Sequence, residues 1–343
     1  MKHIYLLVFL LVSGTASYAQ TTYRSAIVGF YNLENLYDTI FHGSNDDVAF
    51  TPNGAKAYTG KVFNDKLAKL ARVLSQIGTH INPDGPAILG VAEIENKWVL
   101  DTLLRHPLIA ERGYRYVHYD SRDFRGVDVA LIYNPKYFTA ERSRPVFVKI
   151  PAGTKDAAYT RDILWVKGLL DGEQIQLFVN HWPSRSGGQK RSEPARMAAA
   201  TTVRNWIDSL EIIDPGVKTI VMGDMNDDPT DNSIIKGLKA YGDIQSGEPD
   251  ELYNPWMAMY KNGMGTLAYQ DAWSLFDQVL LSRSFLGKKQ AGFFYYKHYI
   301  FKADYMIENT GPYKGYPMRS YNGDVYRGGY SDHFPVYLVL LKR

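Results

Sequence analysis

Short apolar runs alternate with polar or turn-forming segments along the chain, and these runs have the length of β-strands. We predict strands over 25–30, 86–92, 127–133, 163–170, 174–179, 218–222, 274–281 and 336–341. The pair Asp171-Gly172 separates two of these runs and is typical of a β-hairpin turn. The pattern therefore predicts a protein rich in strands, with hairpins among its connections.

Two other segments have the pattern of helices. In 64–77 the apolar residues follow a helical period, and they are Leu67, Leu70, Ala71, Leu74 and Ile77. The Ala- and Arg-containing segment 194–210 is the second predicted helix. Strands, interspersed helices and hairpins together predict an α/β sandwich with mixed sheets rather than a doubly wound parallel sheet. No glycine-rich nucleotide-binding motif opens a helix after a strand, so nucleotide-cofactor folds have no support.

Three segments rich in glycine, asparagine, proline or tyrosine show no clear period: 42–60, 243–272 and 302–330. We expect them to be surface insertions. There is no repeat, coiled coil or low-complexity linker in the sequence. We therefore expect residues 20–343 to form a single domain.

The first residues have the order of a secretory signal peptide. Lys2 precedes the apolar run 4–12, and Ser17-Tyr18-Ala19 places small residues at both positions that a cleavage site requires. The alternative is a membrane anchor, but the apolar run is short for a span of ~20 residues. We predict cleavage of 1–19, no stable membrane insertion afterwards, and a secreted or periplasmic location in a bacterium.

Composition excludes several classes of protein and of site. Of the 343 residues 45% are hydrophobic and 22% are charged, which is typical of a globular chain and not of a disordered one. The formal net charge of +3 neither predicts nor excludes a nucleic-acid surface, because local patches matter more than totals. Cysteine is absent, which excludes disulfides, thiolate nucleophiles, zinc–cysteine sites and iron–sulfur clusters.

Polar residues stand where the predicted strands end. They are Asn32, Glu93, Asn180-His181, Asp224 with Asn226, and Asp332-His333. Such strand ends converge on one edge of a sheet, so we expect these side chains to meet there. Carboxylate and carboxamide oxygens suit Mg²⁺, Mn²⁺ or Ca²⁺. Because no serine nucleophile motif accompanies them, the set predicts metal-assisted hydrolysis with water as the nucleophile.

Seven stretches carry a resemblance to a known family. They are FYNLENL (30–36), GVAEIEN (90–96), RGVDVALIYNP (125–135), VNHWPSR (179–185), VMGDMNDDP (221–229), FDQVLLS (276–282) and SDHFPV (331–336). Their order over 25–340 resembles the endonuclease/exonuclease/phosphatase superfamily. That superfamily includes pancreatic deoxyribonuclease, exonuclease-III-type abasic endonucleases, neutral sphingomyelinases and inositol-polyphosphate 5-phosphatases. The resemblance implies an α+β fold like that of deoxyribonuclease I: a four-layer sandwich of two packed mixed β-sheets flanked by helices.

The resemblance also implies a metal site, with Mg²⁺ as the expected ion and Mn²⁺ or Ca²⁺ as alternatives. Glu93 is then the principal ligand, Asn32 helps to place the metal or its water, and Asp332 is a second carboxylate on the metal side.

The remaining roles implied by the resemblance belong to the reacting groups. Asp224 and Asn226 orient the attacking water, bind phosphate or hold a second metal. His333 contacts the scissile phosphate or acts as the base. His181 takes the place of the other catalytic histidine of deoxyribonuclease-like members, and Asp277 is expected to pair with His181 and fix its tautomer.

Two arginines lie beside these stretches. Arg125 and Arg185 would clamp phosphate oxygens or serve as surface ion-pair partners, and the sequence leaves both interpretations open. Asp128 is equally compatible with a buried hydrogen-bonding role and a catalytic one.

Three functions remain open. The first is a secreted metal-dependent phosphodiesterase with nucleic acid as its substrate. The second is a phosphatase or a phospholipid or inositol-phosphate phosphoesterase, because the fold does not settle the substrate. The third, a non-catalytic binding module, is disfavoured because each matched position keeps a chemically competent residue. The basic run 185–196 suits a nucleic-acid groove or a solvated loop, and the apolar run 252–260 suits a membrane, a base stack or the core. We expect a monomer.

Overall fold

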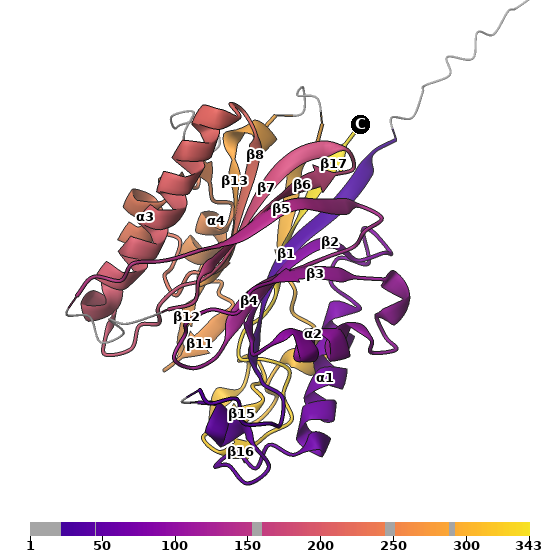
Figure 1. Ribbon diagram of the computed structural model, residues 1–343, viewed down its shortest axis with the longest axis vertical. Coiled ribbons are helices and arrows are strands. Elements are labelled where there is room, and N and C mark those ends of the chain that lie inside the picture. The colour runs from indigo at the N-terminus through magenta and orange to yellow at the C-terminus, as the bar shows by residue number, and fades with distance from the viewer. Residues whose placement is uncertain (1–21, 45, 153–159, 244–250, 288–291) are drawn as a thin grey trace, which may run out of the picture.

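The computed structural model describes residues 22–44, 46–152, 160–243, 251–287 and 292–343. The predicted signal peptide, 1–19, lies outside the described residues. Two large sheets, packed face to face, form the centre of the molecule, and helices cover their outer faces (Figure 1). No helix in the described ranges is long and apolar enough to span a membrane.

The first sheet has six strands, in the order β14-β17-β1-β2-β4-β3. Their bounds are β14 (Phe294–Ile300), β17 (Val336–Lys342), β1 (Arg24–Leu36), β2 (Pro86–Ile94), β4 (Asp128–Tyr133) and β3 (Arg115–His118). β1 and β2 are parallel, whereas the other pairs are antiparallel. The sheet is therefore mixed, as predicted.

The second sheet has seven strands, in the order β5-β6-β7-β8-β13-β10-β9. Their bounds are β5 (Phe138–Val146), β6 (Ile163–Leu170), β7 (Glu173–His181), β8 (Lys218–Asp224), β13 (Asp277–Ser282), β10 (Leu252–Tyr253) and β9 (Ala240–Tyr241). β7 and β8 are parallel, and β6 and β7 form the hairpin predicted at Asp171-Gly172. Two small hairpins lie outside these sheets: β11 (Leu267–Tyr269) with β12 (Ala272–Ser274), and β15 (Tyr321–Asn322) with β16 (Val325–Tyr326).

Four helices accompany the sheets: α1 (Gly60–Leu74), α2 (Lys97–Leu104), α3 (Gln189–Ile213) and α4 (Trp256–Lys261). α1 and α2 cover the first sheet, and α3 runs along the second sheet on the other side of the molecule (Figure 1). The helix predicted over 64–77 is α1. The helix predicted over 194–210 is α3, which begins five residues before Pro194.

The packing produces three apolar layers. Between the sheets lie side chains such as Val28, Leu177 and Met222. A second layer joins the outer face of the first sheet to α1 and α2, and a third joins the second sheet to α3. Because central strands are buried on both faces, they appear in the sequence as continuous apolar runs. The four-layer α+β prediction is therefore confirmed.

Gly29 lies at a close approach of two central strands. It pairs with Tyr337 across β1 and β17, and a Cβ atom there would lie 2.7 Å from the backbone oxygen of Val336. The absence of a side chain lets these strands pair without distortion.

The expected insertions are not wholly at the surface. In 302–330, Met306 and Tyr321 are buried against the first sheet's outer core, and in 42–60 so are Phe50 and Tyr58. In 252–260, Trp256 is fully buried between the layers, so this apolar run belongs to the core. The run predicted as one strand over 274–281 is divided, since β12 ends at Ser274 and β13 begins at Asp277.

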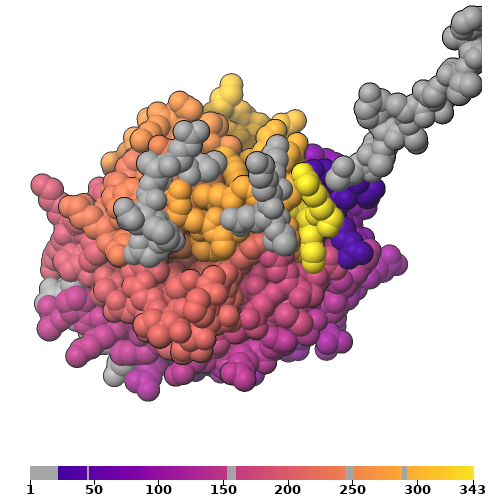
Figure 2. Space-filling view, turned by 90° about the horizontal axis from the view of Figure 1, so that it is seen from above, coloured from indigo at the N-terminus to yellow at the C-terminus, as the bar shows by residue number. Residues whose placement is uncertain are grey.

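The first and last strands lie side by side. Figure 2 shows the end of the chain (yellow) beside the beginning of β1 (indigo), and Arg24 pairs with Lys342 in the ladder. The opposite end of the sandwich receives the ends of β1, β2, β7 and β8 and the beginnings of β13 and β17, because the latter two run antiparallel to their neighbours. The candidate site residues belong to that end.

Candidate active site

Six predicted site residues are brought together by the strand ends of both sheets. Asn32 and Glu93 come from β1 and β2, His181 and Asp224 from β7 and β8, Asp277 from the first position of β13, and His333 from the segment before β17. In the ladder, Asp224 is opposite both His181 and Asp277. All six side chains are buried. The site is thus built on strands and not on long loops.

Glu93 lies at an irregularity of β2. Its φ of +61° is in the left-handed region, which a non-glycine residue rarely adopts, and the register on both neighbouring strands shifts around it. Its Oε2 accepts a hydrogen bond from the backbone N–H of Asn35 at 2.9 Å. Strain of this kind persists only where surrounding contacts hold it, and it is concentrated at functional sites. The bulge aims the Glu93 carboxylate into the site.

Arg125 contacts that carboxylate directly. Its guanidinium lies 3.3 Å from Glu93 Oε2, and it donates further hydrogen bonds to Asn35 and Asp46. Although burial alone would raise the pKa of Glu93, the Arg125 guanidinium outweighs it and holds the pKa below the usual range. Glu93 is therefore ionised, as a metal ligand must be.

Asp224 lies between the two histidines. Its Oδ2 is 3.6 Å from His181 Nε2 and 3.9 Å from His333 Nε2, and it accepts a hydrogen bond from Asn32 Nδ2 at 3.1 Å. Burial, and also the nearby Asp277, raises the pKa of Asp224 to about 6. Asn226 adopts a left-handed φ of +49°, and its backbone N–H donates to Asp224 Oδ1. The Asn226 carboxamide instead donates to the Trp182 backbone oxygen at 2.9 Å, so Asn226 orients Asp224 through its backbone.

Asp277 pairs with His333 and not with His181, so the predicted partner was wrong. Asp277 Oδ2 is 2.7 Å from His333 Nδ1, whereas His181 Nδ1 has no hydrogen-bond partner among the described residues. The reason is topological: β13 begins opposite the end of β8, and the segment before β17 reaches that point from the first sheet.

The two histidines have opposite protonation preferences. Burial, and next the Arg161 guanidinium, lowers the pKa of His181 well below its ordinary value of 6.5. Burial would do the same for His333, but the Asp277 carboxylate outweighs it and raises the pKa of His333 well above 6.5. The site therefore holds one neutral imidazole and one imidazolium.

Arg161 is a residue of this region that sequence reasoning missed. It pairs with the buried Asp123 at 3.0 Å and donates hydrogen bonds to the backbone oxygens of His181 and Trp182. It holds the end of β7 in place. Its position beside the segment 153–159 offered no motif from which this role was predictable.

Glu34 and Lys66 were missed as well. Glu34 accepts a hydrogen bond from the Ser320 backbone N–H, and Lys66 Nζ donates to the Ser320 hydroxyl, each at 2.7 Å. Burial and then the charge of Asp332 raise the pKa of Glu34 to about 7. Asp332 itself is one-third exposed, with Oδ1 3.9 Å from His333 Nε2. Glu34 stands two residues from Asn32 in the FYNLENL stretch, which was the available signal.

Arg185 is occupied by acidic neighbours. Its guanidinium lies 3.2 Å from Asp227, 3.0 Å from Asp228 and 2.6 Å from Asp231, and it also packs over the Phe276 ring. Arg196, from the same basic run, is fully buried against Asp227 at 2.7 Å. These contacts favour the ion-pair interpretation of Arg185 over the phosphate clamp.

A family model described as Endonuclease/Exonuclease/phosphatase family matches residues 27–342. The chain belongs to the endonuclease/exonuclease/phosphatase family. Its enzyme class is that of the metal-dependent phosphoric ester hydrolases. No curated protein matches the chain.

Solved structures of this family share the fold. An endonuclease/exonuclease/phosphatase family protein from Bacteroides thetaiotaomicron has a TM-score of 0.59 and 17% identity, with 94% of this chain and 99% of that chain covered. A mannosyl-6-phosphatase from the same bacterium has a TM-score of 0.55 and 16% identity, covering 92% and 99%. TDP2 from D. rerio, complexed with single-strand DNA product, has a TM-score of 0.52 and 14% identity, covering 92% and 98%.

The donor set fits the divalent cation that this family requires. Ligand atoms of Asp224, Asp277 and His333 lie within 4.8 Å of one another, and Glu93 Oε1 is 3.8 Å from His181 Nε2. Asp277 is fully buried, yet its Oδ1 has no hydrogen-bond partner among the described residues. Buried carboxylates, one of them with an unpaired oxygen, suit a cation of the Mg²⁺ type.

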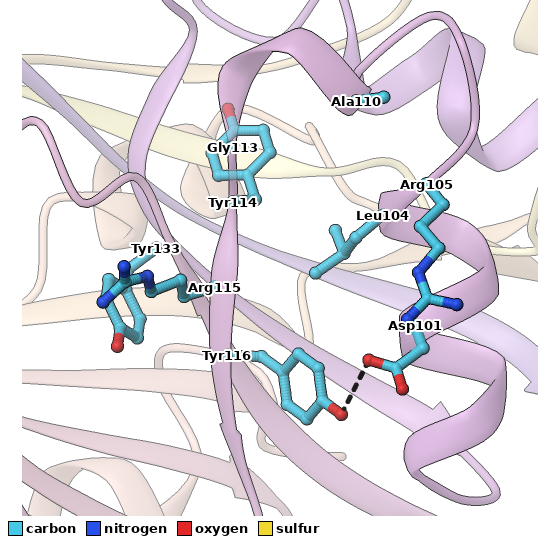
Figure 3. Close-up of a pocket in the computed structure, with 9 residues that line it drawn as sticks. All are labelled: Asp101, Leu104, Arg105, Ala110, Gly113, Tyr114, Arg115, Tyr116 and Tyr133. Carbon is cyan, nitrogen blue, oxygen red and sulfur yellow. Dashed lines mark hydrogen bonds between the residues drawn. The ribbon is translucent and has the colours of Figure 1, made fainter.

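A separate hollow of about 590 Å³ lies beside α2, β3 and β4, and none of the candidate site residues lines it. Figure 3 shows Tyr116 donating a hydrogen bond to Asp101 there, at 3.0 Å. This hollow is distinct from the family's active site.

Proposed function

We propose that this chain is a divalent-metal-dependent phosphodiesterase, with nucleic acid as the first candidate substrate and water as the nucleophile. The observation that carries the proposal is the position of Asp224 between His181 and His333, with Glu93 adjoining them. Carboxylates and imidazoles of this kind activate water and stabilise negative charge, and no cysteine is present to act as a nucleophile.

Glu93, with Asn32 and Asp332, would hold the cation, for which we propose Mg²⁺. When bound, such an ion neutralises charge on the phosphate oxygens and on the leaving oxygen. Arg125, which contacts Glu93, limits the rotation of that carboxylate and keeps it ionised.

His333 would stabilise the charge that develops on phosphorus-bound oxygen. Asp277 engages its Nδ1, so Nε2 is the end that faces the site, toward Asp224 and Asp332. Asp224, oriented by hydrogen bonds from Asn32 and Asn226, would align the attacking water and accept its proton. Acid–base assistance of this kind is worth roughly 10²–10⁴-fold.

A second candidate is the hydrolysis of phosphate monoesters. A nucleic-acid groove along the basic run 185–196 would lack two of its positive charges, because Arg185 and Arg196 are paired with aspartates. A small phosphorylated substrate needs no such groove, and a mannosyl-6-phosphatase is among the similar structures.

The decisive experiment presents single- and double-stranded DNA, RNA, a p-nitrophenyl diester, a p-nitrophenyl monoester and hexose phosphates to the purified protein. Each assay is run with Mg²⁺, Mn²⁺ or Ca²⁺, and with EDTA. We expect metal-dependent cleavage of the nucleic acids and of the diester. Cleavage confined to monoesters would replace the diesterase proposal by the second candidate.

Glu93→Gln serves as the inactive variant. Its matched control is Glu141→Gln, because Glu141 is exposed on β5. Loss of a partner that merely orients a metal ligand costs about 10–100-fold. Loss of the ligand itself is therefore expected to lower kcat/KM by at least about 100-fold. A folded Glu93→Gln protein with full activity would contradict the site assignment.

We also propose export, supported by the signal-like sequence of 1–19, and a monomeric state. After expression in a bacterial host, N-terminal sequencing of the periplasmic or released protein is expected to begin at Gln20. Light scattering coupled to gel filtration is expected to give the mass of one chain.

A further inference from the structure

A second group of metal-binding side chains lies where β1 and β2 end. Asp38 follows the end of β1 and Glu95 follows the end of β2; because these strands are parallel, with Leu36 opposite Ile94, their ends coincide. The Asp38 backbone N–H donates a hydrogen bond to Glu95 Oε2 at 2.7 Å. The imidazole of His42 comes from the segment that follows β1, four residues after Asp38. A cavity of about 690 Å³ is lined by all three residues and gives access from solvent.

The three side chains converge on one point. One ligand atom from each of Asp38, His42 and Glu95 lies within 4.8 Å of the other two. Asp38 Oδ2 is 3.0 Å from His42 Nε2 and also accepts a hydrogen bond from Asn96 Nδ2 at 3.0 Å. Small movements of the half-exposed imidazole suffice to place a cation among them.

Two buried carboxylate oxygens at this position lack a partner. Glu95 is only 8% exposed, and its Oε1 has no hydrogen-bond partner among the described residues. Asp47 is fully buried nearby; its Oδ2 accepts from the His42 backbone N–H, but its Oδ1 is likewise without a partner in the described ranges. An unsatisfied buried polar atom costs about 1–3 kcal/mol, and more when it carries charge. A bound cation would remove this cost.

We propose that Asp38, His42 and Glu95 form a second divalent-metal site, of the nitrogen-and-oxygen type that Zn²⁺ favours. Mg²⁺ and Ca²⁺ prefer oxygen ligands alone, whereas Zn²⁺ accepts imidazole nitrogen together with carboxylate oxygen. The Asn96 carboxamide and Asp47 would orient the ligands from outside, and water from the cavity would complete the coordination.

This site is structural and separate from the active site. Among the described residues, no hydrogen bond joins Asp38, His42 or Glu95 to a candidate catalytic side chain. Its effect is to fasten residues 37–44 to the end of β2. Farther along the chain, Asp46 contacts Arg125, which in turn contacts Glu93. The proposal does not depend on the substrate of the enzyme.

The test counts Zn²⁺ bound per chain by equilibrium dialysis and elemental analysis. His42→Ala is the principal variant, because the side chain is 49% exposed and its loss spares the core. His80→Ala, which removes an exposed imidazole outside this group, is the matched control. We expect His42→Ala to bind one Zn²⁺ fewer than the wild type and than His80→Ala.

Comparison with the catalytic variant separates the two sites. Glu93→Gln is expected to lose a different metal ion, the one bound at the active site. The double variant His42→Ala/Glu93→Gln is therefore expected to lose both ions. Glu95→Gln, checked for folding by circular dichroism, is expected to match His42→Ala. Unchanged Zn²⁺ binding in His42→Ala, or a double variant that loses no more than Glu93→Gln alone, would overturn the proposal. The proposal would also be overturned if this site bound Ca²⁺ equally well in the wild type and in His42→Ala.

Discussion

At the scale of single residues, the electrostatics of the site depend on which carboxylate each histidine contacts. Asp277 is bonded to His333, whereas His181 has Arg161 behind it and no carboxylate within hydrogen-bonding distance of its Nδ1. This difference favours the protonated form of His333 and the neutral form of His181. One substitution at Asp277 therefore tests the acid–base assignment.

Asp277→Asn is expected to lower kcat by roughly 10²–10⁴-fold, the usual contribution of acid–base assistance. The amide cannot stabilise the imidazolium, so the pKa of His333 should fall, which histidine resonances in an NMR pH titration would report. Asp128→Asn is the matched control, because Asp128 forms a similar buried pair with His118 at 3.0 Å. Equal losses in both variants would mean that Asp277 acts only on stability.

At the scale of elements, two contacts of the first sheet serve its packing and involve no candidate catalytic side chain. One is the close pairing of β1 with β17 at Gly29, in the middle of the first sheet. The other is the packing of β14 against α4, where His298 meets the Trp256 ring edge to face at 4.9 Å. Neither contact belongs to the active site, so each can be tested by stability alone.

Gly29→Ala is expected to destabilise the fold by about 1–3 kcal/mol, because the new Cβ would collide with the backbone of β17. Gly60→Ala, at the start of α1 with open space around it, is the control and is expected to be neutral or to stabilise by up to about 1 kcal/mol. Urea unfolding of both variants measures the difference. A harmless Gly29→Ala would show that the two strands separate easily.

His298 is expected to make the fold sensitive to acid. Burial and then Lys297 lower its pKa to about 4, against about 6.5 in the unfolded chain. The unfolded state therefore takes up a proton first, and stability is lost as the pH falls from about 6.5 through 4. The shift corresponds to about 3 kcal/mol. Thermal unfolding of His298→Phe from pH 7 to pH 4 should show a smaller loss than the wild type, and the exposed His80→Phe should follow the wild type.

At the scale of the whole molecule, the active site unites both sheets, so a metal bound there also joins them. Mg²⁺ at about 100 times its Kd is expected to raise the free energy of unfolding by about 2.7 kcal/mol. Calorimetry with and without Mg²⁺ measures the effect. His42→Ala should keep the increase and Glu93→Gln should lose it. An increase that survives in Glu93→Gln would place the stabilising ion elsewhere.

Much of this architecture was predictable from sequence because the central strands are buried on both faces. The run 86–92 is apolar throughout and stops at Glu93, and the run 218–222 ends in Ile220, Val221 and Met222 two positions before Asp224. In both cases one boundary marked the strand and the site residue. In contrast, β14 contains Tyr-Tyr-Lys-His-Tyr and lies at the edge of its sheet, so no apolar run revealed it.

The contacts between site residues were less predictable. The partner of Asp277 depends on how β13 meets the segment before β17, and local sequence does not encode that meeting. The pairing of the partly buried Arg185 with three aspartates likewise needed the tertiary structure, since both phosphate binding and ion pairing suited the sequence. The single-domain extent of 20–343 stays a prediction.

The pairing of β1 with β17 also determines when the first sheet can form during protein synthesis. Arg24 finds its partner only when Lys342 has left the ribosome, and β14 waits for the same strand. Until then β1 can pair with β2 alone, and one side of the apolar layer between the sheets stays open to water. Contacts so distant in sequence also slow folding. The first sheet is therefore expected to stay incomplete until β17 has been made, and a nascent chain of this protein is expected to need chaperones up to that point.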